Sequence, residues 1–271
     1  MNQTFSFQRW SLLVGKHWAE NKKKYLLSIV AFIGLTFVWY VFVMLVDDSN
    51  PLAAGLQQVT FLFSLFLVGP FYASQFFREL SSGPKAINYL MVPASALEKL
   101  LCSLFYVIVI FFIVFVAAFY LVDAISVMIA NLIHPSYNYG NVKANVINVF
   151  RSNEMPKDVT FYFLLMFFTI QSAALLGSVY FVQYSYIKTA ITIALLCLVV
   201  ALLEYYLTNR LLPPGNFYEG RGTYLFYGRD GSNKVVELPH AIMNVLFILF
   251  KYAFPPILWL TTYFRLKEKE V

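Results

Sequence analysis

The residues that could do chemistry are few and are scattered along the chain. The three histidines, His17, His134 and His240, form neither an H-E-x-x-H nor an H-x-E arrangement. The sequence also contains no G-x-S-x-G nucleophile motif and no G-x-x-x-x-G-K-[ST] phosphate loop. We therefore expect no catalytic residue, no metal site and no directly bound cofactor in this chain.

Carboxylates are the remaining candidates for acid and base chemistry. Asp47 and Asp48 are adjacent and follow the first long apolar segment, where a solvated loop cap is favoured over a metal site. An intramembrane enzyme that uses Asp47, Asp48, Asp123 or Glu204 is an alternative. It is disfavoured because these carboxylates are spread over different segments, whereas acid and base groups must lie close together.

Polar residues inside long apolar segments are costly and are therefore functional candidates. Glu204 lies late in the segment 188–208, where the interpretation as a residue of the outer interface is favoured. Lys251 lies near the middle of 241–264 and is expected to have a partner or to face a cavity. Gln171 either lines a polar path or hydrogen-bonds between helices.

The composition places these residues in a membrane. Of the 271 residues, 60% are hydrophobic and 13% are charged, whereas soluble domains are about 45–50% apolar and about 25% charged. Cys102 and Cys197 both fall in apolar blocks, which argues against a disulfide framework or a zinc site. The net charge of +6 comes from basic residues at the ends of apolar blocks. They indicate topology and contacts with lipid headgroups rather than nucleic acid.

The apolar blocks have the length that crosses a hydrocarbon core of about 30 Å as a helix. The six predicted spans are 25–46, 57–77, 101–122, 160–183, 188–208 and 241–264. Continuous apolar blocks predict helices rather than the alternating strands of a barrel. The predicted fold is thus an all-α integral membrane protein with a six-helix domain over 25–271. Two pairs within spans should kink their helices, Gly69 with Pro70 and Pro255 with Pro256. These kinks are either hinges or plain packing features.

The flanking charges and the loops complete the predicted topology. Basic residues are more frequent in the segments on the side of the N-terminus, which predicts that both termini are cytoplasmic. The segments 123–159 and 209–240 are then external. Within the second, Tyr224–Tyr227 and Lys234–Leu238 flank an Asp-Gly pair, which predicts a small external β-hairpin.

Residues 1–24 precede the first span and form a predicted unit of their own. Phe7, Trp10, Val14 and Trp18 recur at spacings of three and four. This pattern predicts an interfacial amphipathic helix with Trp10 and Trp18 as anchors. The alternative is a cytoplasmic extension of the first membrane helix.

The segment 78–100 lies between the second and third spans. Ser82 and Gly83 interrupt the chain after Glu79, and Pro93 opens a turn before Glu98 and the third span. The pattern predicts a short cytoplasmic helix along the membrane surface, and its Ala86, Leu90 and Met91 are able to lie against the membrane or a partner. Such a helix suits the transmission of motion to a soluble subunit.

This segment resembles the one found in membrane subunits of type 2 ATP-binding-cassette (ABC) exporters. In that family an amphipathic helix precedes six spans. After span two come an acidic residue, a glycine four positions later, a leucine, a Pro-small-Ser turn and a lysine. Here these places are taken by Glu79, Gly83, Leu90, Pro93, Ala94, Ser95 and Lys99. The resemblance implies that 79–99 holds a coupling helix that docks on a separate ATPase subunit, with contacts at Glu79, Ser82, Gly83, Lys85, Pro93 and Glu98.

The resemblance also implies a function. It implies a permease subunit that pairs with a second copy or a related permease in a bacterial inner membrane and exports a hydrophobic or amphipathic substrate. ATP and Mg²⁺ would be bound by the partner ATPase. The alternative hypothesis is a membrane scaffold or sensor that binds a ligand or partner protein through its external loops.

Overall fold

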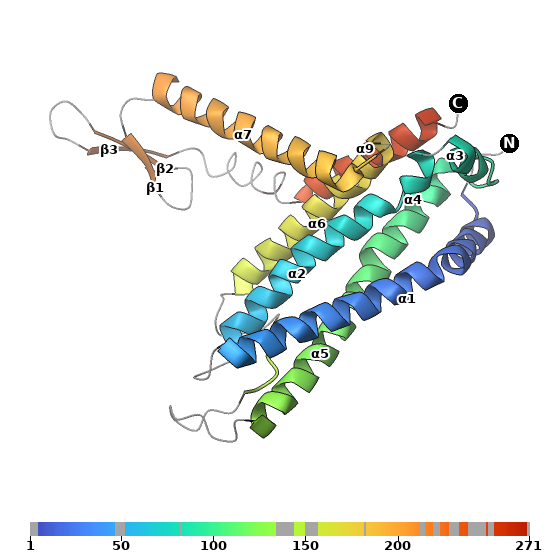
Figure 1. The fold of residues 1–271 in the computed structure, drawn as a ribbon. Helices are drawn as coiled ribbons and strands as arrows, with labels where there is room; N and C mark the ends of the chain where they lie inside the picture. The colour runs from blue at the N-terminus through green and yellow to red at the C-terminus, as the bar shows by residue number, and fades with distance from the viewer. Residues whose placement is uncertain are drawn as a thin grey trace.

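The computed structural model of the chain is predominantly α-helical (Figure 1). It describes residues 5–46, 52–81, 83–133, 144–149, 157–181, 183–211, 215–218, 223–227, 233–237, 248 and 252–269. The helices are α1 (Phe7–Val46), α2 (Ala54–Gln75), the 3₁₀ helix η1 (Arg78–Ser81), α3 (Gly83–Leu90), α4 (Ala96–Leu104), the π-helical turn η2 (Phe105–Ile110), α5 (Phe111–Ile133), α6 (Lys157–Tyr180), α7 (Ser185–Leu211) and α9 (Phe254–Lys269).

Five helices in the described part of the chain are long and apolar enough to cross a membrane. They are Phe7–Val46, Ala54–Gln75, Ala96–Ile133, Val159–Tyr180 and Ser185–Leu207. These helices and the composition are those of an integral membrane protein. The five helices cover the first five predicted spans. Six spans were predicted, and residues 241–247 and 249–251 of the sixth lie outside the described residues.

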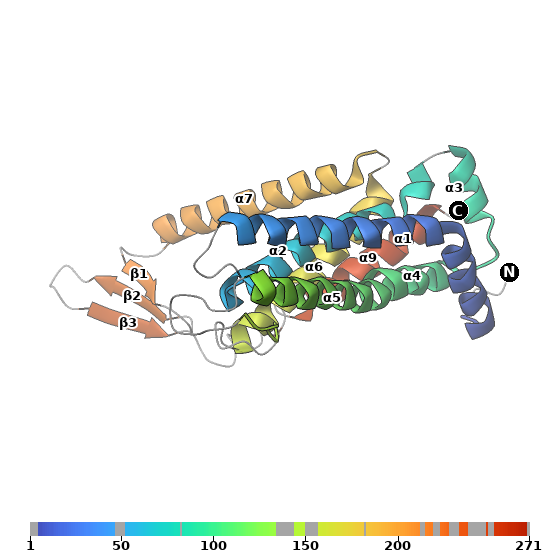
Figure 2. The same cartoon turned by 60° about the horizontal axis from the view of Figure 1, so that its bottom comes forward.

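The helices form an elongated bundle with two distinct ends. Both termini and α3 lie at one end, and the strands lie beyond the other (Figures 1 and 2). We call these the terminal end and the sheet end. Helix α6 packs on α2 and α9, and α1 packs on α5. Helix α7 packs on α6 and α2 near its start and is otherwise largely exposed.

An aromatic core holds the middle of the bundle. The rings of Phe61 and Phe119 meet edge to face with centroids 5.0 Å apart, and those of Phe111 and Phe115 stack at 5.6 Å. Phe167 of α6 lies against the Cα of Gly69, because a Cβ there would come within 2.4 Å of its Cε2 atom. Gly69 and Pro70 are both buried inside an uninterrupted α2. Gly69 therefore serves close helix packing, which is the packing interpretation of this pair, and a hinge here stays a prediction.

The third span is longer than predicted. The helix that begins at Ala96 continues to Ile133, so residues 123–133 of the predicted external segment 123–159, about three helical turns, belong to this helix. Asp123 was expected to begin that loop, but it is completely buried within α5. The helix continues because Ser126, Val127 and Ala130 extend its buried face.

The N-terminal segment is continuous with the first span. Helix α1 runs from Phe7 to Val46 without a break at residue 24, and Figure 2 shows that its N-terminal part bends sharply away from the rest. Part of the predicted amphipathic face contacts protein. Leu13 is buried with Cys102 and Tyr106, and Trp10 packs edge to face on Phe105. The two predicted segments thus form one bent helix, and the interfacial position of its N-terminal part stays a prediction.

Helix α9 holds the second predicted hinge pair. Pro255 and Pro256 lie in its first turn, and a hinge at this pair stays a prediction. Proline is tolerated there because the first backbone N–H groups of a helix have no carbonyl partner within it. Helix α9 then runs to the terminal end of the bundle (Figure 1).

Three short strands lie between α7 and α9. They are β1 (Gly215–Tyr218), β2 (Thr223–Tyr227) and β3 (Asn233–Glu237), paired antiparallel in the order β1-β2-β3. Strands β2 and β3 overlap the predicted ranges 224–227 and 234–238 without matching their bounds, and β1 was not predicted. The connection 228–232 lies outside the described residues. The external position of this sheet stays a prediction.

Candidate functional site

The segment 78–100 folds into a compact cap on the terminal end of the bundle. Helix η1 follows α2, α3 follows η1, and residues 91–95 turn the chain into α4. Ser95 ends the turn with a capping box: its Oγ accepts a hydrogen bond from Glu98 N at 3.3 Å, and its N–H donates to Glu98 Oε2 at 2.8 Å. This reciprocal pair fixes where α4 begins.

Glu98 also holds the N-terminal segment. Its Oε1 atom accepts hydrogen bonds from the backbone N–H of Ser6 at 2.8 Å and from Nη2 of Arg9 at 2.9 Å. The Glu98 side chain is completely buried, whereas 39% of the Arg9 side chain is exposed. Glu98 was predicted to contact an ATPase, but a buried carboxylate with these partners is a positioning residue. Its role is to join the start of α1 to the start of α4.

Helix α3 is tied to the bundle through aromatic and cationic contacts. The ring of Tyr89 lies edge to face with Phe77, with centroids 6.3 Å apart. Nζ of Lys99, a buried side chain, lies 5.5 Å from the centroid of the same Tyr89 ring. Phe77 belongs to a buried cluster with Leu175 of α6 and Leu266 of α9. A displacement of α3 would therefore act on α2, α4, α6 and α9 together.

The outer surface of this cap carries two large apolar side chains. Ile87 is 59% exposed and Met91 is 76% exposed, and their spacing of four residues places them on the same side of a helix. Arg78 and Pro93 are also exposed. From the sequence, Met91 was expected to be able to contact the membrane or a partner, whereas Ile87 was not named. The signal that indicates the pair is the spacing of four residues between Ile87 in α3 and Met91 directly after it.

The remaining predicted contact residues fall in different places. Glu79 is half-buried in η1, and Gly83 begins α3. Ser82 lies outside the described residues, as does the side chain of Lys85. The structure thus gathers Glu79, Gly83, Lys85 and Pro93 at one end of the bundle and buries Glu98 beneath them.

The end of α9 docks beside this cap. Nζ of Lys269 donates a hydrogen bond of 2.6 Å to the carbonyl oxygen of Val179, near the end of α6. The Arg265 guanidinium lies 4.8 Å from the centroid of the Tyr180 ring and pairs with Glu268. Burial, and to a lesser degree the charge of Arg265, lowers the pKa of Lys269. The C-terminal helix is therefore held to α6 by named contacts.

Gln171 hydrogen-bonds between helices. It is buried in α6, and its Nε2 donates to the carbonyl oxygen of Val107 at 2.5 Å. Val107 lies in the π-helical turn η2, and such turns leave carbonyl groups outside the regular α-helical pattern. This contact does not support the other interpretation, in which Gln171 lines a polar path. Asp47, Asp48, Lys251 and the side chain of Glu204 lie outside the described residues.

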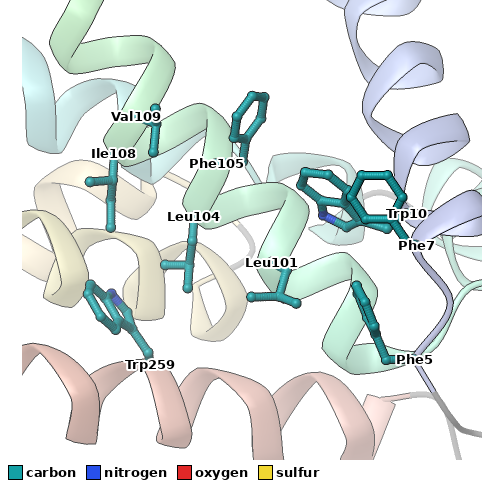
Figure 3. Close-up of a pocket in the computed structure, with 9 residues that line it drawn as sticks. All are labelled: Phe5, Phe7, Trp10, Leu101, Leu104, Phe105, Ile108, Val109 and Trp259. Atoms are coloured by element: carbon teal, nitrogen blue, oxygen red, sulfur yellow. The ribbon is translucent and has the colours of Figure 1, made fainter.

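An apolar groove runs between the N-terminal segment, α4, η2 and α9. Its volume is about 460 Å³. Figure 3 shows its nine lining residues, Phe5, Phe7, Trp10, Leu101, Leu104, Phe105, Ile108, Val109 and Trp259. None of them can act as an acid, a base or a nucleophile, so this surface suits contact with hydrocarbon. Trp18, the second predicted anchor, is 46% exposed on α1.

The described residues offer no metal centre, since no three His, Cys, Asp or Glu residues among them gather closely enough to hold an ion. No protein-family description matches the chain, and neither a curated protein nor a solved structure matches it. The geometry of the cap is therefore the basis for a proposed function.

Proposed function

We propose that this chain is the permease subunit of an ABC transporter and that a separate ATPase docks on the cap formed by residues 78–100. The observation that carries the proposal is the exposed pair Ile87, on the short helix α3, and Met91, directly after it. The same helix holds Tyr89, which packs on Phe77 and lies near Lys99. Isolated exposed apolar residues are common, but a pair on a short surface helix at the end of a membrane bundle suits a docking site.

The mechanism would use the contacts beneath the cap. Movement of the ATPase would displace α3, and Tyr89, Phe77 and Lys99 would pass that displacement to α2 and α4. The link between Glu98 and Arg9 would carry it to α1. Such coupling requires rigid contacts rather than a catalytic group in this chain, and ATP with Mg²⁺ would be bound by the partner.

The bundle is expected to act with a second permease copy or a related permease in a bacterial inner membrane. The apolar groove and the largely apolar bundle surface support a hydrophobic or amphipathic substrate. In this arrangement both termini and the cap are cytoplasmic, and the sheet of β1 to β3 is external. The helical topology supports this because both termini and α3 share one end.

A scaffold or sensor is the second candidate function. The observation that favours it is the folded sheet of β1 to β3, because a paired sheet offers an ordered surface to a ligand or partner protein. In that case removal of the sheet would abolish function, while changes on the cap would leave it intact.

The test is affinity purification of the tagged chain in mild detergent, with an ATPase assay and identification of bound proteins. Wild type is compared with the variant Ile87→Ser/Met91→Ser. The matched control is Met128→Ser/Leu132→Ser, because these α5 residues are also four apart, are 67% and 72% exposed, and lie at the other end of the bundle.

We expect a stoichiometric ATPase with wild type and with the control, and its loss in the cap variant. A second comparison uses Glu79→Ala, which should weaken ATPase coupling, with Glu20→Ala on α1 as its control. A chain that purifies without any ATPase, or a cap variant that retains one fully, would refute the proposal.

A further inference from the structure

Asp123 is a carboxylate sealed inside the bundle toward the sheet end. Its side chain has no solvent exposure, and neither of its carboxylate oxygens has a hydrogen-bond partner of good geometry within the described ranges. The hydroxyl group of Tyr40 on α1 lies beside it. Transferring an isolated charge into apolar surroundings costs far more than a folded protein can offset. Something must therefore neutralise this group.

Two further polar atoms on the same packed helices lack partners. Tyr40 and Ser126 are both completely buried, and the Tyr40 hydroxyl and Ser126 Oγ have no hydrogen-bond partner in the described part of the chain. Ser126 follows Asp123 by three residues, so the two side chains lie on one face of α5. The Tyr40 hydroxyl faces the Asp123 carboxylate across the contact between α1 and α5, and Ser126 adds a third buried polar side chain on the same face of α5. Buried polar atoms without partners indicate a missing water or ion.

Among the residues that the structure describes, the elements around Asp123 supply no counter-ion. Residues 25–46, 54–75, 100–133, 144–149 and 159–181 contain no Lys, Arg, His or Glu, and Asp123 is their only charged residue. The titratable group that faces Asp123 from a packed element, within the described residues, is Tyr40. The surrounding cluster is otherwise apolar, with Met44, Phe119, Val122 and Val127 among its members.

We propose that Asp123, Tyr40 and Ser126 form a binding site for one monovalent cation, either a proton or a sodium ion. Carboxylate and hydroxyl oxygens are ligands that hard cations prefer. A single positive charge neutralises the carboxylate, whereas a divalent ion would leave a net charge in the apolar core. The bound cation joins α1 to α5 at the end opposite the cap. This site is independent of the proposed ATPase contact.

Thermal unfolding of the purified chain, monitored by tryptophan fluorescence, tests whether sodium is the bound cation. The unfolding temperature is measured in sodium chloride and in choline chloride at equal ionic strength, for wild type and for Asp123→Asn. If sodium is the ligand, it stabilises wild type and leaves Asp123→Asn unchanged. Ser126→Ala should raise the sodium concentration that gives half of the stabilisation by roughly fivefold to tenfold, because one contact about as strong as a hydrogen bond is lost. Glu20→Gln is the control for loss of an acidic group and should respond as wild type does.

Infrared spectroscopy tests whether a proton is the bound cation. If a proton is the ligand, wild type shows the carbonyl stretching band of a protonated carboxylic acid, Asp123→Asn lacks it, and Tyr40→Phe shifts it. Tyr40→Phe and Ser126→Ala keep the test decisive if Asp123→Asn fails to fold. A wild type that shows neither a sodium response nor an acid carbonyl band would carry an ionised carboxylate paired within the chain, and this result would overturn the proposal.

Discussion

Nη2 of Arg9 lies 2.9 Å from Oε1 of Glu98, which joins two helix starts that are 89 residues apart in the sequence. The same carboxylate caps α4 through Ser95 and binds the backbone N–H of Ser6. Three segments therefore depend on one buried side chain. The contact ties the N-terminal part of α1 to the helix that follows the cap, so the two are expected to move as a unit.

Glu98→Ala should destabilise the protein. The change removes three hydrogen bonds to a buried carboxylate, one of them the side-chain half of the capping box, and we expect a loss of about 2–4 kcal/mol in the free energy of unfolding. Denaturant titration in detergent measures it. Glu20→Ala removes an exposed carboxylate, 3.8 Å from Lys16, and should have little effect. Equal losses in the two variants would contradict the role of Glu98.

Gly69→Ala should disturb the packing of α2 on α6. The new Cβ would lie 2.4 Å from Phe167, whose ring is completely buried among other aromatic rings and has little room to move. We expect a loss of about 1–3 kcal/mol. Gly34→Ala is the matched control in α1, where a Cβ meets nothing within 4 Å. It should be neutral or stabilising by up to about 1 kcal/mol. A neutral Gly69→Ala would contradict the close packing of Phe167 on Gly69.

Gln57→Leu should release the segment 144–149. The Gln57 amide donates to Asn145 O at 3.1 Å and accepts from Ile147 N at 3.3 Å, contacts that leucine cannot make. Hydrogen exchange at the Ile147 amide should accelerate by about tenfold, which corresponds to about 1.4 kcal/mol. Gln75→Leu, in the last turn of the same helix, should leave that exchange rate unchanged.

Cysteine labelling should place the two ends of the bundle on opposite sides of the membrane. In a background with Cys197→Ser, since Cys197 is exposed and Cys102 is buried, we expect Met91→Cys to react with an impermeant maleimide only from the cytoplasmic side. Val146→Cys, which is 45% exposed at the sheet end, should react only from the other side. Labelling of both positions from one side would contradict the topology.

Much of the fold could be predicted from hydropathy because long apolar blocks in a membrane have few alternatives to helix. The first five spans, the short helix after α2 and the ranges of β2 and β3 follow from such local patterns. The far end of α5 was missed because Asp123 was interpreted as a boundary. A charged residue normally ends a span, but this one is buried against a helix that lies 83 residues away in the sequence, at Tyr40.

The site was less predictable than the fold. Sequence patterns located the cap but not which of its residues face outward. Glu98 was assigned to the surface and is buried, whereas Ile87 was not named and is exposed. Burial of a side chain in a short segment depends on contacts between distant segments, here Ser6 and Arg9 with Glu98, and these are not visible in local spacing.

Site-specific photo-crosslinking in cells tests the central claim most directly. A photoreactive residue replaces Met91 on the cap, and another replaces Met128 at the other end as the control. We predict that position 91 captures an ATPase that carries a G-x-x-x-x-G-K-[ST] phosphate loop, in amounts that respond to ATP, and that position 128 does not. Capture of no such ATPase at position 91 would contradict the account and move the function to the sheet of β1 to β3.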